Sequence, residues 1–191
     1  MKLHFLGGAK EIGGSAILVE LNDYKILLDC GIRQSAGKDP LPDFRKIQEL
    51  GGVDAVIISH AHMDHTGTLP LISKEYPLAS IYATVMTIDL TRVLLYDSIK
   101  LMNRKEEGIP VYAAAHVEAL FTRMRGCRYE ETLEILPGLK LTTSTNAFSS
   151  TCRLACNLSP YVASVMITSG RNLGILIPSM VFWAKPEKSP V

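Results

Sequence analysis

Short apolar runs separated by turns make up most of this chain, and a long helical pattern begins only after residue 84. Alternating or continuous apolar runs of four to eight residues predict strands. The predicted strands are residues 2–6, 16–21, 24–28, 53–58, 80–83, 132–136 and 139–143. Two further apolar segments, 161–168 and 173–177, flank Ser169-Gly170-Arg171-Asn172 and predict a hairpin.

Four segments show apolar positions at helical spacing. The first is 44–50, which ends at Gly51-Gly52, a pair suited to the left-handed residue that closes many helices. The second helix is predicted to begin at 66–72. The third runs over 85–102 with Thr84 as its N-cap, and the fourth covers 114–125. Strands that alternate with helices indicate an α/β fold.

Three of the five histidines and a carboxylate fall within His60-Ala61-His62-Met63-Asp64-His65. Because they follow a β-branched run, we expect them in a loop at the end of a buried strand. Their spacing differs from the i, i+4 pair of helical zinc motifs. Imidazole nitrogen and carboxylate oxygen suit zinc, and a mixed set is typical of a catalytic site with an open coordination position. The alternative is a histidine-rich surface loop that binds nothing.

This motif resembles the signature of the metallo-β-lactamase fold, a superfamily of mostly hydrolytic metalloenzymes. Three features resemble its β-CASP branch, whose members cut nucleic acid, chiefly RNA: the glycine-rich opening at 6–15, Asp29 at a strand end, and a Thr-led helix carrying Asp97-Ser98. The resemblance runs from residue 1 to about residue 143. It implies an α/β fold, a metallo-β-lactamase-like αββα sandwich that is incomplete at the C-terminus.

The resemblance also implies a zinc-dependent hydrolase of RNA phosphodiester bonds. In a complete family member, His60 and His62 would hold one zinc, Asp64 and His65 would hold the other, and Asp64 would orient the attacking hydroxide. Asp29 would fix the orientation of a ligand from behind. The implied partner is single-stranded RNA. The resemblance does not distinguish an endonuclease from an exonuclease. Two alternatives stay open: a hydrolase of esters, thioesters or lactams, and a non-enzymatic remnant.

After residue 143 the sequence departs from the family pattern. No histidine follows His116, and residues 146–149 and 178–180 stand where the family has Gly-His and Gly-Asp. We therefore predict a metallo-β-lactamase-like domain at 1–143, an atypical tail at 144–191 and no β-CASP domain. A reading-frame error near residue 144 is the favoured explanation. The other two explanations are a diverged family member with altered metal binding and a short protein that pairs with a second chain.

Four ligands divided between two sites leave each with two, so we expect fewer than two zinc ions in this chain. Ser59 and Thr66 are expected to shape the loop with their hydroxyls. Composition changes this interpretation little, because 191 residues with 47% apolar and 20% charged residues fit one globular domain.

The net charge of +1 gives no global attraction to a polyanion, so positive potential along a groove would be local. A cluster such as Arg123, Arg125 and Arg128 is expected to be a solvated face. Apolar runs are too short to cross a bilayer and the N-terminus lacks a signal-peptide pattern, which predicts a cytoplasmic protein without a membrane partner. Four scattered cysteines predict buried, unpaired thiols, and the oligomeric state stays open.

Overall fold

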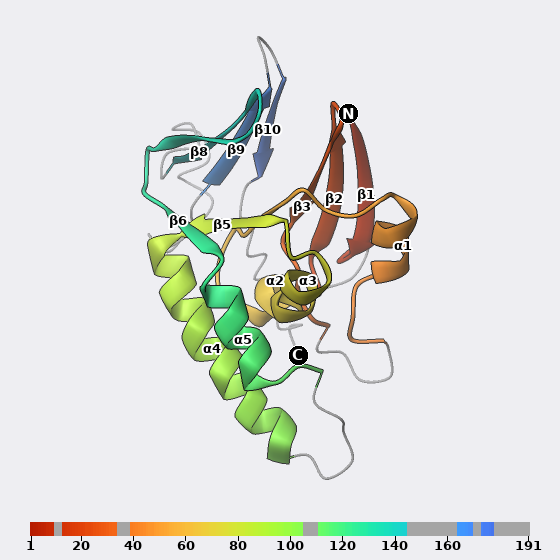
Figure 1. Ribbon diagram of the computed structural model, residues 1–191, viewed down its shortest axis with the longest axis vertical. Helices are drawn as coiled ribbons and strands as arrows, with labels where there is room; N and C mark the ends of the chain where they lie inside the picture. Colours follow the sequence, from red (N-terminus) through yellow and green to blue (C-terminus); the bar gives the residue numbers. More distant parts are fainter. Residues whose placement is uncertain (10–12, 34–38, 105–110, 145–163, 170–172, 178–191) are drawn as a thin grey trace, which may run out of the picture.

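Two β-sheets and a set of helices form the fold of a computed structural model that describes residues 1–9, 13–33, 39–104, 111–144, 164–169 and 173–177 (Figure 1). In chain order the elements are β1 (Lys2–Gly7), β2 (Ala16–Leu21), β3 (Tyr24–Leu28), α1 (Phe44–Glu49), β4 (Ala55–Ile57), α2 (Met63–Thr66), α3 (Leu69–Glu75), β5 (Ser80–Thr84), α4 (Val85–Arg104), α5 (Ala114–Phe121), β6 (Met124–Cys127), β7 (Thr132–Leu136), β8 (Leu139–Ser144), β9 (Ser164–Ser169) and β10 (Leu173–Ile177).

The larger sheet has the strand order β1-β2-β3-β4-β5-β6. Its first three strands are antiparallel, and β3, β4, β5 and β6 are parallel. Parallel strands end at one edge of a sheet, where ligand sites of α/β proteins usually lie. Asp29, Ser59 and Thr84 therefore come to the same edge, because they stand at the ends of β3, β4 and β5.

Side chains of the larger sheet alternate between two apolar layers, as expected for a sheet that is covered on both faces. On one face, Leu27, Val56 and Ile81 pack with residues of α1, α3, α4 and α5, such as Ile47 and Leu120. The opposite face packs against the second sheet. This inter-sheet core contains Val19, Ile26, Leu28, Ile57, Tyr82, Ile135, Leu139 and Leu141.

The second sheet has the order β10-β9-β8-β7 and is antiparallel throughout. The predicted hairpin is confirmed, because β9 and β10 pair in register from Leu173 opposite Ser169 to Ile177 opposite Val165. The boundary predicted at residue 143 falls within β8, which pairs with β9. That boundary stays a prediction, and residues 146–149 and 178–180 lie outside the described residues.

The predicted layered α/β fold is confirmed for one helical layer and both sheets. The other helical layer of an αββα sandwich is not found among the residues that the structure describes. The strand predicted at 53–58 is shorter, because β4 covers only Ala55–Ile57. The predicted N-cap is confirmed, because the Thr84 hydroxyl oxygen accepts a hydrogen bond of 3.2 Å from the backbone N–H of Thr87.

The helix predicted at 114–125 was wrong at its C-terminal end. α5 ends at Phe121, and Met124–Cys127 forms β6. This segment pairs with β5, from Ile81 opposite Met124 to Thr84 opposite Cys127. The backbone hydrogen bonds available at the sheet edge therefore outweigh the local helical pattern.

The helix predicted to begin at 66–72 was wrong only in its start, because Thr66 ends α2 and a separate helix, α3, begins at Leu69. The helical conformation is interrupted at Gly67 and Thr68, where the backbone N–H of Thr68 donates to the carbonyl oxygen of Cys30 at 3.0 Å. At Gly67 an added Cβ would lie 2.5 Å from Ile32 Cγ2. A tertiary contact with the segment after β3 therefore interrupts the helix.

Two other expectations concern thiols and membranes. Cys30 and Cys127 are buried free thiols, as predicted, and the other two cysteines lie outside the described residues. Over the part of the chain that the structure describes, no helix has the length and apolar character needed to span a bilayer.

Candidate metal centre

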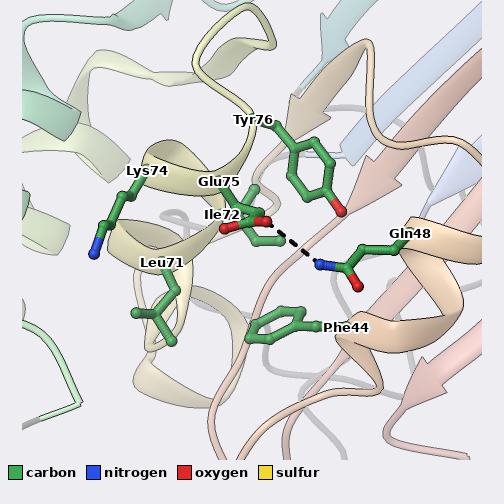
Figure 2. Close-up of a pocket in the computed structure, with 7 residues that line it drawn as sticks. All are labelled: Phe44, Gln48, Leu71, Ile72, Lys74, Glu75 and Tyr76. Atoms are coloured by element: carbon green, nitrogen blue, oxygen red, sulfur yellow. Dashed lines mark hydrogen bonds between the residues drawn. The ribbon is translucent and has the colours of Figure 1, made fainter.

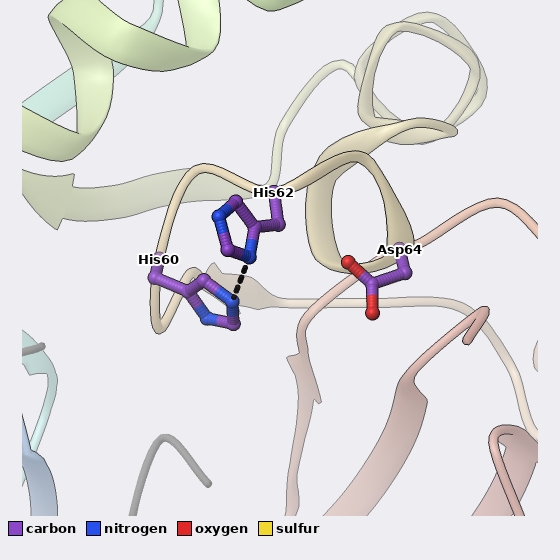
Figure 3. A group of neighbouring side chains, drawn as sticks. All are labelled: His60, His62 and Asp64. Atoms are coloured by element: carbon purple, nitrogen blue, oxygen red, sulfur yellow. Dashed lines mark hydrogen bonds between the residues drawn. The ribbon is translucent and has the colours of Figure 1, made fainter. Parts of the chain in front are cut away.

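Three predicted ligands converge at the C-terminal end of β4. One ligand atom each of His60, His62 and Asp64 lies within 4.8 Å of the other two. The two imidazoles approach most closely, with His60 Nε2 3.2 Å from His62 Nδ1. Figure 3 shows these rings directed toward each other and the Asp64 carboxylate on the first turn of α2. His60 is buried, Asp64 is half-buried and His62 is exposed, so the group opens to solvent on one side.

The fourth predicted ligand, His65, is held by Asp29 rather than by the other three residues. Its Nδ1 lies 2.7 Å from Asp29 Oδ2, whereas its Nε2 lies 3.6 Å from Asp64 Oδ2. A carboxylate on one ring nitrogen fixes the tautomer and leaves the other nitrogen for a metal. His65 is therefore oriented with Nε2 on the side of Asp64.

Asp29 also connects β3 with the end of β4. Its Oδ1 accepts hydrogen bonds from the backbone N–H of Ser59 at 2.8 Å and from the Ser59 hydroxyl at 2.9 Å. The same hydroxyl lies 3.0 Å from His60 Nδ1. One buried carboxylate thus positions two imidazoles, His65 directly and His60 through Ser59.

The backbone around Asp29 holds α2 in place. Asp29 has a φ of 57°, a left-handed conformation that aspartate tolerates better than most residues. The backbone N–H groups of Ser15 and Cys30 donate to the carbonyl oxygens of Asp64 and His65, both at 2.7 Å. At Gly31 an added Cβ would lie 1.7 Å from the carbonyl oxygen of Asp64, so only glycine fits there. The close packing of Gly31 against the backbone of Asp64 thus fixes the position of α2, and with it the backbone positions of Asp64 and His65.

Burial and nearby charges set the protonation of the two inner imidazoles. Burial, with the neighbouring His65 as the next cause, lowers the pKa of His60 to about 4, which keeps this imidazole neutral. For His65, burial acts to lower the pKa, but the hydrogen bond and charge of Asp29 outweigh it and raise the pKa above its ordinary value. One ring nitrogen of His60 thus has a lone pair available to a metal at neutral pH.

The hydroxyls of Ser59 and Thr66 hold the loop through hydrogen bonds, as predicted. The thiol of Cys30, which the sequence did not indicate, lies nearby. Thr66 Oγ1 donates to the carbonyl oxygens of Ala61 and His62 at 3.0 and 3.1 Å. Cys30 Sγ lies 2.9 Å from Thr68 Oγ1, and burial raises the pKa of this thiol to about 12. Cys30 is therefore a packing residue here and not a nucleophile. The glycine at position 31, directly after Asp29-Cys30, is the signal in the sequence that could have indicated this close packing.

The predicted basic cluster does not form one solvated face. Arg125 and Arg128 are exposed, but Arg123 is half-buried and binds backbone at the end of α3. Its guanidinium donates to the carbonyl oxygens of Tyr76 and Ala79 at 3.0 and 3.3 Å. Arg123 thus ties the segment between α3 and β5 to the residue that precedes β6.

The donor set suits a divalent metal ion. Two imidazole nitrogens and a carboxylate oxygen provide three converging donors, the number that catalytic zinc sites commonly use. His60 is neutral, and the Ser59 hydroxyl, which is bound to Asp29, provides its Nδ1 with the outer hydrogen bond that metal-ligating histidines usually make. The residues therefore fit a divalent cation, and His65 lies beside this group, with its Nε2 3.6 Å from Asp64 Oδ2.

Comparison with known proteins agrees with this geometry. Residues 9–94, which contain all four predicted ligands and Asp29, match the family model of the metallo-beta-lactamase superfamily. The chain therefore carries a domain of the metallo-β-lactamase superfamily, as the motif predicted.

Archaeal proteins match about three quarters of this chain. The chain is 36% identical over 149 residues to "Transcription termination factor FttA" of Thermococcus kodakarensis, which covers 72% of this chain and 22% of that protein. It is 32% identical over 148 residues to the protein of the same name from Methanothermobacter thermautotrophicus, covering 74% of this chain and 22% of that protein. The chain thus spans about a fifth of the length of these relatives.

Solved structures support the fold alone. A B3 metallo-β-lactamase with an active-site glutamic acid superposes with a TM-score of 0.54 at 16% identity, over 91% of this chain and 58% of that one. MEM-A1, a subclass B3 metallo-β-lactamase from a soil metagenome library, gives a TM-score of 0.52 at 20% identity, over 91% and 58% of the two chains. The predicted fold family is confirmed.

Proposed function

We propose that this chain is the metal-binding part of a β-CASP-type ribonuclease, a zinc-dependent hydrolase of RNA phosphodiester bonds. The observation that carries the proposal is the convergence of His60, His62 and Asp64 within 4.8 Å at the end of a parallel strand. Identity of 32–36% with proteins named transcription termination factors supports a nucleic acid as the substrate. The likeness to β-lactamases lies below 25% identity, and it gives no support to a lactam substrate.

Each site residue has a distinct part in this proposal. His60, His62 and Asp64 would hold one metal ion, and His65 with Asp64 would provide the first donors of a second position. A divalent metal at these donors would acidify water and neutralise the negative charge of a phosphodiester. Asp64 is the proposed catalytic residue, because its half-buried carboxylate can also accept a hydrogen bond from the attacking water.

The remaining residues act on the ligands rather than on the substrate. Asp29 holds the Nδ1 proton of His65 and the Ser59 hydroxyl, and so keeps both inner imidazoles in fixed orientations. The exposed ring of His62 lies on the open side, where a substrate would approach. Positioning residues therefore surround the buried half of the site and leave the other half accessible.

Zinc content is the first test of this proposal. The described ligands form one three-donor group and one pair, so we expect fewer than two zinc ions per chain after dialysis against a mild chelator, measured by elemental analysis. His62→Ala should remove the bound zinc. His116→Ala is the matched control, because His116 lies on α5 and accepts a hydrogen bond from the backbone of Ala113. Two retained zinc ions, or zinc that survives in His62→Ala, would contradict the assignment.

The substrate class is best tested with a fusion protein that joins this chain to the remaining segments of an archaeal relative. We propose that residues 1–143 are the metallo-β-lactamase-like part, that the tail at 144–191 is atypical, and that this chain alone cleaves little RNA. Fusion to the segments of an archaeal relative that lie outside the matched region should give zinc-dependent cleavage of single-stranded RNA, with binding that weakens as salt rises. Asp64→Ala should abolish it. Turnover of esters or lactams without RNA cleavage would instead assign a small-molecule hydrolase.

The origin of the tail is tested at the level of the gene. Independent reads of the locus should reveal Gly-His and Gly-Asp in another reading frame downstream of residue 144. An intact frame in all reads would exclude a frame error and leave the diverged protein or the chain that pairs with a second one.

A further inference from the structure

A cavity lies between α1 and α3, separate from the metal centre (Figure 2). Its volume is about 250 Å³, and its apolar walls are Phe44 of α1 with Leu71 and Ile72 of α3. It lies near the N-terminal end of β4, because the Tyr76 ring is 3.3 Å from the position of a Cβ on Gly52. His60 follows the opposite end of the same strand.

Polar groups line the same cavity. The Gln48 amide nitrogen donates to Glu75 Oε1 at 3.4 Å, a long hydrogen bond between two exposed side chains that a ligand can replace. The Tyr76 hydroxyl is buried and has no hydrogen-bond partner among the described residues. Figure 2 shows this hydroxyl directed toward Gln48. One amide, one carboxylate and one unsatisfied hydroxyl thus gather beside an aromatic ring.

Contacts with Arg123 and Gly52 fix the position of Tyr76. Its carbonyl oxygen accepts a hydrogen bond of 3.0 Å from the Arg123 guanidinium, and its ring lies against Gly52. Burial, and next the charge of Glu75, raises the pKa of Tyr76, so the hydroxyl stays protonated at neutral pH and can donate. The cavity is therefore preformed on this side, while Gln48 and Glu75 can adjust.

We propose that this cavity binds a nucleobase that carries an exocyclic amine, with adenine as the best match. Phe44 offers a stacking surface, and glutamine is the usual bidentate partner of adenine, because its oxygen accepts from N6 and its nitrogen donates to N7. Glu75 is an acceptor for an exocyclic amine. A carbonyl-bearing base such as uracil has no amine for Gln48 and Glu75, and should bind more weakly.

A nucleobase accounts for the wall chemistry better than an apolar side chain of a protein partner. An aliphatic side chain would cover the Gln48 amide and the Glu75 carboxylate without replacing their hydrogen bonds, which is costly. The volume also lies below that of usual drug-sized pockets and suits a single ring system. The base could belong to a free nucleoside or to RNA, and only the choice of RNA as its source rests on the proposed function.

Adenosine is the probe, because it has no phosphate that a metal could attract. In the full chain, adenosine should shift the backbone amide resonances of α1 and α3 in a saturable titration, and uridine should bind at least about fivefold more weakly. Phe44→Ala should weaken adenosine about tenfold or more, as expected for the loss of one stacking surface. Gln48→Ala, an exposed position, should weaken it severalfold without affecting the fold.

Matched controls separate this site from the metal centre. Glu49→Gln on α1 is the local control, because the Glu49 carboxylate pairs with Lys46 at 3.1 Å and does not line the cavity. Circular dichroism establishes that each variant is folded. His62→Ala should leave adenosine binding unchanged, so failure of the ribonuclease proposal would not affect this result.

Three outcomes would overturn the base-binding proposal. The first is no saturable shift in α1 and α3 with adenosine. The second is equal binding of adenosine, uridine and a purely apolar ring such as toluene, which would assign the cavity to an apolar side chain of a protein. The third is adenosine binding that Gln48→Ala and Phe44→Ala leave intact. Tighter binding of an oligoadenylate than of adenosine, lost in Phe44→Ala, would identify RNA as the source, and equal binding would identify a free nucleoside.

Discussion

The two ends of β4 differ in how they are held. At its C-terminal end, the ligands are fixed by backbone hydrogen bonds of 2.7 Å and by the buried carboxylate of Asp29. Near its N-terminal end, the cavity between α1 and α3 has one side-chain hydrogen bond of 3.4 Å across it and an unsatisfied Tyr76 hydroxyl. A site for a metal needs donors in fixed positions, whereas a cavity that exchanges its own hydrogen bonds for those of a ligand does not.

The largest effect should come from Gly31→Ala. An added Cβ would lie 1.7 Å from the Asp64 carbonyl oxygen, so β3 and α2 must separate. We expect a loss of about 3 kcal/mol or more in the free energy of unfolding, together with loss of metal. Denaturant unfolding and elemental analysis measure both.

Gly138→Ala is the control for Gly31→Ala. Its φ of 73° strains an alanine, but a Cβ there meets nothing within 4 Å, so the cost should be about 1 kcal/mol. If the two variants were equally stable, the close approach at Gly31 would not be what holds the metal loop.

Asp29→Asn tests the carboxylate without disturbing the backbone, because asparagine also tolerates a positive φ. The amide can accept only with its oxygen, so either Ser59 or His65 loses its partner. We expect about 10- to 100-fold weaker metal binding and a loss of about 2 kcal/mol in stability. Calorimetric metal titration and urea unfolding are the measurements.

The control for Asp29→Asn is Asp54→Asn. This exposed carboxylate accepts a hydrogen bond of 2.7 Å from the backbone of Lys25 and lies at the other end of β4. It should leave metal binding unchanged. Equal losses in the two variants would show that the Asp29 contacts have no special role in the site.

Tyr76→Phe should have the opposite sign. It removes a buried hydroxyl that has no partner, so we expect a gain of up to about 1 kcal/mol at neutral pH. The folded state raises the pKa of Tyr76, so above about pH 10 the unfolded chain has lost a proton that the folded chain retains. Stability of the parent chain therefore falls as pH rises through this range, and the advantage of Tyr76→Phe should grow.

Urea unfolding at pH 7 and at pH 10.5 measures the Tyr76→Phe effect. The control is Tyr24→Phe, on β3 and outside the cavity. A destabilised Tyr76→Phe would indicate that the hydroxyl has a partner in solution.

The smallest effect should come from Gln48→Ala. Because the Gln48–Glu75 hydrogen bond is long and exposed, its removal should change stability by less than about 0.5 kcal/mol. Thermal unfolding of this variant beside Ser59→Ala, which removes a buried hydroxyl bound to Asp29, compares the two ends of β4 directly. A similar large loss in both would remove the difference between them.

The sequence predicted most of the elements because their apolar patterns match the layers that bury them. The strands β2 and β3 were placed at the observed bounds, and Thr84 caps α4 as expected. The errors fall where partners distant in the chain decide the conformation. Met124–Cys127 becomes a strand only because β5 presents an edge, and α2 ends where Cys30 takes the hydrogen bond of Thr68.

The sequence by itself determined the ligand types, because His60, His62, Asp64 and His65 stand together in the chain and need no fold to become neighbours. It also indicated the superfamily and the position of the motif at a strand end. Only the tertiary structure decided which atoms converge: Asp29, thirty-six positions before His65, reaches its Nδ1 because β3 and β4 are parallel neighbours. The cavity between α1 and α3 likewise depends on two helices that the sequence separates. Contacts between distant segments arise from packing, which local pattern does not encode.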